Sequence, residues 1–206
     1  TAFVSLIAVC FALDQKENLR DFLALMLALE AGTLGVFVAL DTILFYVFWE
    51  LMAISSVFLI WARRTQRANA AGVRYLVFQV GSGVILLAGI LLRSADQPSG
   101  VLRFEVMQLD SLAATLIFLA IGIKCAFPLL HNWLQDAYPE ATVTGAVFLS
   151  AFTTKTAVYV LIRTFPGTEV LVWLGAVMAI YGVVYAVLEN DCRRLLAYHI
   201  VSQVGY

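Results

Sequence analysis

The chain consists of apolar segments of about 20 residues that are separated by short polar connections. Twenty residues of α-helix extend about 30 Å, the thickness of the hydrocarbon core of a bilayer. None of the segments shows the strict alternation over about ten residues that is typical of a membrane β-barrel. The pattern therefore predicts an all-α, polytopic transmembrane helix bundle. Its six complete helices are expected at Leu19–Val38, Thr42–Trp61, Val73–Leu92, Leu109–Leu130, Ala141–Ile162 and Glu169–Leu188.

Two shorter apolar stretches flank these six segments. The first ends near Leu13, and the second begins near Leu195 and runs to Tyr206. Neither is long enough to cross a bilayer. We therefore expect residues 1–206 to form a single transmembrane domain that is an interior fragment of a longer subunit, with two partial helices at its ends.

Composition agrees with the membrane interpretation. Hydrophobic residues make up 62% of the 206 residues, and charged residues only 13%. These values lie outside the range of soluble globular proteins. The expected surroundings are the lipid bilayer and other membrane subunits, and no nucleic-acid partner is expected.

Basic residues in the connections fall into two groups on alternate sides of the predicted spans. Since cytoplasmic connections are rich in Lys and Arg, the larger group predicts the cytoplasmic side of a cell inner (cytoplasmic) membrane. The larger group consists of Lys16, Arg20, Arg63, Arg64, Arg67, Arg74, Arg193 and Arg194, and the smaller one of Arg93, Arg103 and Arg163.

Four ionisable residues lie inside the predicted spans: Glu30, Glu50, Lys124 and Lys155. A charge at the centre of a membrane helix costs roughly 2.5–3.5 kcal/mol, so such residues usually face the bundle interior and mark ion or proton pathways. Burial disfavours the charged form of a lysine, whereas a nearby carboxylate favours it. A lysine beside a carboxylate can therefore act as a switchable proton carrier. The alternative interpretation is a set of structural ion pairs that fix helix packing.

The surroundings of the two lysines add to the transport hypothesis. Pro128 cannot donate a hydrogen bond to the carbonyl of Lys124, which predicts a discontinuous helix near Lys124–Pro128. Broken membrane helices often line ion sites. Lys155 is surrounded by hydroxyl side chains, among them Thr154, which can hold water or bond to backbone carbonyls. Both roles remain open for any single hydroxyl.

The two histidines, His131 and His199, are expected near the cytoplasmic ends of their segments. Haem binding requires histidines inside facing spans, so an electron-transfer cytochrome is disfavoured. The connection 131–140 is expected as an interfacial turn or short helix. With no zinc, phosphate-loop or nucleotide motif in the chain, we predict no metal site, no cofactor and no redox centre.

At these residues the chain resembles the antiporter-like, proton-conducting membrane subunits of respiratory complex I, Mrp-type sodium/proton antiporters and membrane-bound hydrogenases. The resemblance rests on four stretches in the family's order, which are Leu29–Met52, Gly122–Ala141, Leu149–Arg163 and Leu195–Tyr206. Gln135 departs from the family pattern, which often has proline there. The histidine at 199 fits the antiporter branch, whereas Leu29–Met52 leans toward complex I, so the branch stays open.

The resemblance implies a role for each of three residues. Glu50 and Lys124 would form a charged pair, and Lys155 would pass protons onward, as in a subunit of about 14 helices. Glu30, Pro128, His131, Thr154 and His199 are accessory candidates. The chain is thus expected to translocate protons, or sodium and protons, as part of a larger complex. The alternatives are a quinone- or electron-transfer-associated membrane subunit and a structural membrane scaffold.

Overall fold

The computed structural model describes residues 2–13, 19–96 and 103–206. Within these ranges the chain is almost entirely helical, and its one isolated β-bridge joins Asp41 to Arg103. This confirms the predicted all-α fold. The helices are α1 (Ala2–Ala12), α2 (Leu19–Val38), α3 (Thr42–Trp61), α4 (Gln66–Asp96), α5 (Leu112–Lys124), α6 (Asn132–Ala137), α7 (Val143–Thr164), α8 (Glu169–Leu188) and α9 (Cys192–Gly205).

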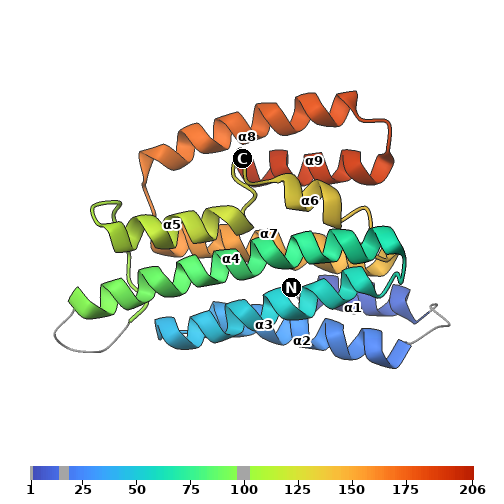
Figure 1. The fold of residues 1–206 in the computed structure, drawn as a ribbon, viewed down its shortest axis with the longest axis horizontal. Helices are drawn as coiled ribbons and strands as arrows, with labels where there is room; N and C mark the ends of the chain where they lie inside the picture. Colours follow the sequence, from blue (N-terminus) through green and yellow to red (C-terminus); the bar gives the residue numbers. More distant parts are fainter. Residues whose placement is uncertain (1, 14–18, 97–102) are drawn as a thin grey trace.

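The long helices run side by side in one bundle (Figure 1). Helices α8 and α9 form a hairpin along one side, and α2 and α3 lie on the opposite side. The shorter α5 and α6 follow one another along the length of α4, and both pack against it. Five helices in the described ranges, namely α2, α3, α4, α7 and α8, are long and apolar enough to cross a membrane.

Sequence and structure agree most closely where apolar runs end at turn or cap residues. Helices α2, α3 and α8 have the predicted bounds, and α3 begins after Asp41, whose carboxylate accepts hydrogen bonds from two backbone N–H groups of the first turn. Such capping side chains favour a helix start. Helix α4 is longer than its apolar segment, 31 residues in all. No helix-breaking residue stops it at the edge of the apolar run.

The predicted continuous segment Leu109–Leu130 is the main correction to the helix bounds. Only Leu112–Lys124 is helical. The N–H of Phe127 donates to the carbonyl of Gly122, and that of Ala126 to the carbonyl of Ile123. This is the Schellman arrangement that ends many helices, with Ala126 in the left-handed region at φ 60°.

The predicted discontinuity beside Lys124 is therefore present, but the helix ends before the proline acts on it. Among the described residues, no backbone N–H donates to the carbonyl of Lys124. Gly122 is required by this turn, because a Cβ atom there would overlap the ring of Phe127. Pro128 lies in the break and prevents the helix from resuming at once.

The connection that follows the break contains a short helix, as expected, but its aromatic residues are buried in the protein. Helix α6 is packed into the protein, and Trp133 and Tyr138 are buried. The indole N–H of Trp133 donates to the carbonyl of Ile123, and the hydroxyl of Tyr138 donates to the carbonyl of Leu149. Their polar atoms are satisfied by backbone inside the bundle, so these aromatic residues do not need the interface that the sequence suggested.

The two groups of basic residues lie at opposite ends of the bundle. Arg63 and Arg193 both contact the connection between α6 and α7. At the other end, Arg163 donates to the carbonyls of Phe37 and Ala39. The predicted sorting of charges is therefore present in the fold, whereas Lys16 lies outside the described residues.

Candidate functional site

Lys124 is the last residue of α5, and its side chain is fully buried. Its ammonium group donates a 3.0 Å hydrogen bond to the backbone carbonyl of Trp49 on α3. The same nitrogen lies 3.9 Å from the centroid of the Trp49 ring, which is a cation–π contact. One residue thus supplies both a carbonyl dipole and an aromatic face to a buried amine.

Glu50 follows Trp49 directly on α3 and is half-buried. Its Oε1 atom is buried and has no hydrogen-bond partner among the described residues. Gly83 of α4 makes this position possible, because a Cβ atom at residue 83 would overlap Oε1. The carboxylate therefore occupies the space that a side chain on α4 would otherwise fill.

Glu50 and Lys124 interact electrostatically across the α3–α5 contact without touching directly. The two charges influence each other, yet no ion pair within 4.0 Å joins them in the described part of the chain. The expected charged pair is therefore an indirect one, in which Lys124 is held by the backbone of the residue beside Glu50.

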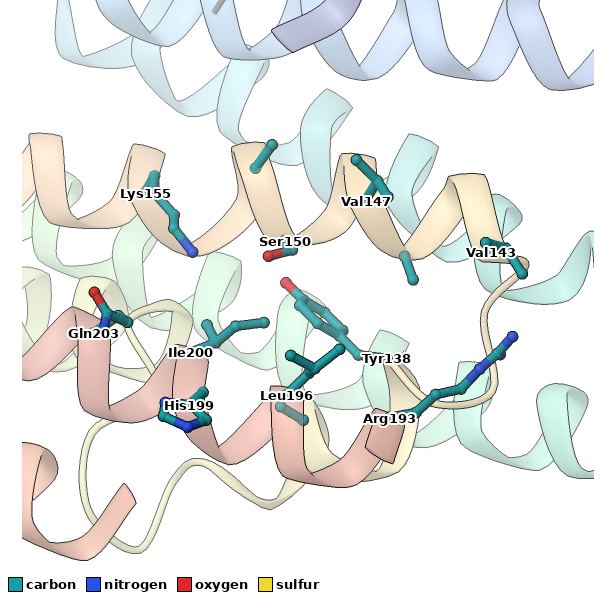
Figure 2. A pocket seen from close by; sticks show the side chains of 13 residues that line it. Tyr138, Val143, Val147, Ser150, Lys155, Arg193, Leu196, His199, Ile200 and Gln203 are labelled. Carbon is teal, nitrogen blue, oxygen red and sulfur yellow. The ribbon is translucent and has the colours of Figure 1, made fainter. Parts of the chain in front are cut away.

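Lys155 occupies a different setting from the one its sequence suggested. It lies on an exposed face of α7 and lines a groove of about 590 Å³ between α7 and α9. Val143, Val147, Ala151 and Lys155 recur every four residues, so they share this face. The side chain of Lys155 points across the groove toward α9 (Figure 2). Within the described residues the side chain of Lys155 is exposed, and its burial in a longer subunit stays a prediction.

The accessory candidates are spread over several places. His199 is exposed and lines the same groove as Lys155. Thr154 is fully buried, and its hydroxyl has no partner among the described residues. Glu30 is partly exposed on α2, where no described hydrogen bond or ion pair joins it to the other candidates.

His131 is the accessory residue whose position differs most from the prediction. It lies in the break between α5 and α6 and not at the end of a span, and it is buried. Its Nε2 atom is 2.8 Å from the hydroxyl of Tyr181 on α8, and the two rings meet edge to face. This contact ties the discontinuity beside Lys124 to the α8–α9 hairpin.

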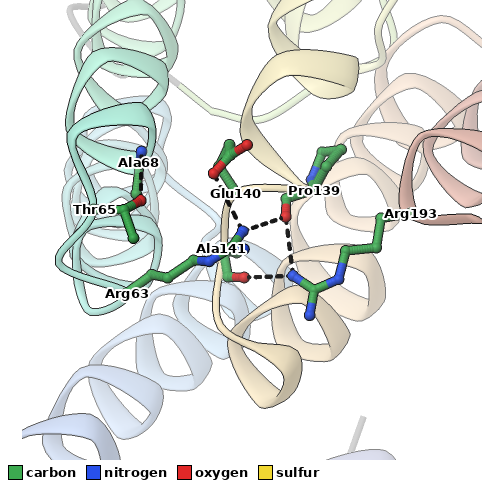
Figure 3. Close-up of polar contacts among 7 residues, drawn as sticks. All are labelled: Arg63, Thr65, Ala68, Pro139, Glu140, Ala141 and Arg193. Carbon is green, nitrogen blue, oxygen red and sulfur yellow. Dashed lines mark hydrogen bonds and ion pairs between the residues drawn. The ribbon is translucent and has the colours of Figure 1, made fainter. Parts of the chain in front are cut away.

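Arg193, which lines the groove, belongs to a cluster of arginine contacts that Figure 3 shows. The carbonyl of Pro139 accepts hydrogen bonds from Arg63 at 2.8 Å and from Arg193 at 2.9 Å. Arg193 also donates to the carbonyl of Ala141, and Arg63 pairs with the carboxylate of Glu140. Three separate elements, the α3–α4 turn, the α6–α7 connection and the start of α9, are fixed together at this point.

Sequence reasoning missed the residues that hold Lys124 in place. Trp49 contacts Lys124 through its backbone carbonyl and its ring. A contact through a backbone carbonyl cannot be predicted from the type of residue. Gly83 is likewise not distinguished by the sequence from the other glycines of the same apolar run. A usable signal was present in α4, where Gln79 and Ser82 are polar residues inside the apolar run 76–92. Among the described residues, no group of three or more His, Cys, Asp or Glu side chains is placed to hold a metal.

Residues 39–206 match the model of the family described as NADH:quinone oxidoreductase/Mrp antiporter, transmembrane. The chain belongs to this family. It is 30% identical to NADH-quinone oxidoreductase subunit M of Escherichia coli (strain K12), across the whole chain and 46% of that protein. It is 34% identical to NAD(P)H-quinone oxidoreductase chain 4 2 of Thermosynechococcus vestitus (strain NIES-2133 / IAM M-273 / BP-1), across the whole chain and 42% of that protein.

A solved structure shows the same fold. A chain of the Mrp complex from Dietzia sp. DQ12-45-1b superposes with a TM-score of 0.81 and 28% identity, covering 88% of this chain and 37% of the other. The chain therefore spans less than half the length of the relatives that it matches. Its assignment as a multi-pass membrane protein of this family, made from sequence, is confirmed.

Substituting the glycine beside Glu50 tests the close approach of α3 and α4. We expect Gly83→Ala to displace the Glu50 carboxylate and to lower the thermal unfolding midpoint of the full-length protein relative to that of Gly81→Ala. The difference in stability should be about 1 kcal/mol, the low end of overpacking costs, because the displaced atoms are the end of a flexible side chain. Gly81→Ala is the matched control, since a Cβ atom there meets nothing within 4 Å. It should leave the midpoint unchanged or raise it, as Ala is a better helix former than Gly. Equal midpoints for the two variants would contradict the contact.

The arginine cluster gives a second test with adjacent residues. Arg193→Met removes two hydrogen bonds from a charged donor, each worth about 1.5–3 kcal/mol in favourable settings, and should lower the unfolding midpoint by several degrees. Arg194→Met removes only a 4.0 Å pair with Glu189, which is worth at most about 1 kcal/mol. A midpoint for Arg193→Met as high as that for Arg194→Met would show that the cluster does not stabilise the fold.

Proposed function

We propose that the chain is part of a membrane subunit that translocates protons, or sodium ions and protons, and that Lys124 is its switchable proton carrier. One observation carries the proposal: a fully buried ammonium group at the end of a broken helix, held by the carbonyl and ring of Trp49 beside the carboxylate of Glu50. A buried lysine with one neutral acceptor and one nearby carboxylate is stabilised most strongly in its charged form while that carboxylate is charged and close.

The indirect geometry of the pair supports switching. When one partner of a directly bonded buried ion pair is removed, the protein is destabilised by about 3–5 kcal/mol. Here Lys124 keeps its bond to the Trp49 carbonyl whatever the state of Glu50. Movement or protonation of Glu50 then changes the proton affinity of Lys124 without releasing the side chain from its place.

Lys155 is proposed as the next proton carrier. It lies on α7, which packs against α5, and it faces a groove that also contains His199 and Gln203. An amine on such a face can accept a proton from the bundle interior and pass it to whatever covers the groove in the whole protein. The relatives are more than twice as long as this chain.

We further propose that the subunit works inside a multisubunit complex of the cytoplasmic membrane. Two relatives are named as a subunit and a chain of quinone oxidoreductases, and the similar structure comes from an Mrp complex. The described residues themselves offer apolar helix faces to lipid or to neighbouring subunits. In α2, α3, α4 and α8, half or more of the residues of the most apolar window are not buried within the chain, and in α8 most are not.

The decisive experiment compares variants of Lys124 in the full-length protein assembled in its complex. We expect Lys124→Met to abolish proton uptake into reconstituted vesicles. Lys124→Arg should abolish it as well, because a guanidinium keeps its charge but does not release its proton. Lys155→Met should lower uptake to a tenth or less of the wild-type rate.

The arginine variant separates transport from a purely structural role. If Lys124 only locked helices through its charge, Lys124→Arg would retain uptake wherever the complex assembles. Arg194→Met controls for the loss of a basic residue outside the site and should leave uptake unchanged. Proton uptake that survives Lys124→Met and Lys155→Met in assembled complexes would disprove the proposal.

A further inference from the structure

The turn between α3 and α4, together with the first turns of α4, carries a concentration of arginines. Arg63 and Arg64 lie in the turn, and Arg67 and Arg74 lie on α4. The last two are seven residues apart, so they share one face of the helix. All four residues are exposed. We call them the α3–α4 basic patch.

Two members of the α3–α4 basic patch already have a carboxylate partner. Arg63 pairs with Glu140 at 3.2 Å (Figure 3), and Arg74 pairs with Asp136 at 3.2 Å. No ion pair joins Arg64 or Arg67 to a carboxylate in the described ranges. Two guanidinium groups of the patch are therefore available to an anion that approaches from outside the chain.

Trp61 places the α3–α4 basic patch at the surface of the membrane. Its indole ring lies against Gly72 of α4, where a Cβ atom would overlap it. A tryptophan at the end of a span is typical of the boundary between hydrocarbon and headgroups. At 1.5 Å per residue, Arg67 lies about 8 Å outward of Gly72 and Arg74 about 3 Å inward of it. Because arginine side chains are long and the headgroup layer is roughly 5–8 Å thick, both guanidinium groups can reach this layer.

The face of α4 that continues from the patch into the membrane is open to lipid. Val73, Val77 and Val84 are 53%, 66% and 61% exposed, and their spacing places them in one stripe of the helix. Gly81 follows Arg74 by seven residues, and a Cβ atom there would meet nothing within 4 Å. Since no described helix covers this face, an acyl chain can lie along it while its headgroup is level with the arginines.

Phosphate is the anionic group that a membrane supplies at the level of the patch. Guanidinium groups bind phosphate oxygens through paired, charge-assisted N–H···O bonds. The N-terminus of the long helix α4 adds its partial positive charge at the same place. A zwitterionic lipid brings a cation of its own, whereas an anionic lipid can neutralise the unpaired arginines. Basic clusters beside the end of a span accordingly attract anionic lipids.

We propose that the α3–α4 basic patch binds the headgroup of an anionic phospholipid in the leaflet at this end of the bundle, which the sorting of basic residues predicts to be the cytoplasmic one. Arg64 and Arg67 contact the phosphate, and the acyl chains lie along the exposed stripe of α4. Arg63 and Arg74 stay with their carboxylates. The inference does not depend on proton translocation, and its failure would leave the proposed function unaffected.

The test measures lipid at this site in the full-length protein assembled in its complex. The photoreactive residue p-benzoylphenylalanine replaces Ala70, which is exposed and lies on α4 between Arg67 and Arg74. The complex is placed in phosphatidylcholine vesicles that contain increasing fractions of labelled phosphatidylglycerol, and the label crosslinked to this subunit is counted. We expect saturable labelling by phosphatidylglycerol, and much weaker labelling when the label is carried by phosphatidylcholine.

The double variant Arg64→Gln/Arg67→Gln should raise the half-saturating fraction of phosphatidylglycerol at least tenfold. Each basic residue near an anionic surface contributes about fivefold in affinity, equal to about 1 kcal/mol. The matched control is Arg20→Gln/Arg194→Gln, which removes the same charge from exposed residues at the same end of the bundle. Its half-saturating fraction should stay within twofold of that of the unsubstituted arginines.

A lysine variant separates lipid binding from a local structural effect. Arg64→Lys/Arg67→Lys keeps both charges, so its half-saturating fraction should lie well below that of the glutamine variant. If the lysine and glutamine variants are labelled equally poorly, the loss reflects the shape of the turn and the inference is wrong. It is also wrong if the control pair loses as much labelling as the glutamine variant, if phosphatidylcholine labels as strongly as phosphatidylglycerol, or if a partner subunit covers the patch and no labelling occurs.

Discussion

The structure depends on placing one ammonium group inside an apolar bundle. An isolated charge in such surroundings is costly, so the protein must supply compensating dipoles where the charge lies. For Lys124 these come from the carbonyl and ring of Trp49. The compensation is possible only because α5 ends at Lys124, which brings the flexible side chain to the end of a helix and not to its middle. The break in the helix and the burial of the charge are thus one feature.

The same break organises the elements around it. The chain leaves α5 through a Schellman turn, continues into α6 along α4, and then enters α7. The indole N–H of Trp133 in α6 donates to the carbonyl of Ile123, which also accepts from the N–H of Ala126 in the turn. His131 contacts Tyr181, and the arginine cluster holds the connection after α6. Polar contacts on three sides therefore fix a segment that a continuous helix would have fixed by its own hydrogen bonds.

The sequence alone was sufficient to predict the parts of this arrangement that follow from local chemistry. Apolar length set the bounds of α2, α3 and α8, and Pro128 located the discontinuity. Lys124 was identified because a lysine in a span is rare. The contact that holds Lys124 was out of reach, since every residue has a carbonyl and only the fold decides which one faces the amine. The groove that Lys155 borders was out of reach for a related reason, because a charge inside a span does not show which face of the helix carries it.

The difference between the two lysines has a physical consequence for any proton path through the chain. Lys124 is enclosed, so its proton affinity depends on a few fixed groups, chiefly Glu50 and Trp49. Lys155 borders an open groove, and its proton affinity depends on what covers that groove. A proton that moves from Lys124 to Lys155 leaves a site whose proton affinity is set by residues of this chain. It enters a site whose proton affinity depends on what covers the groove. In the proposed order the Glu50–Lys124 pair switches first, and release from Lys155 then depends on the groups that cover the groove.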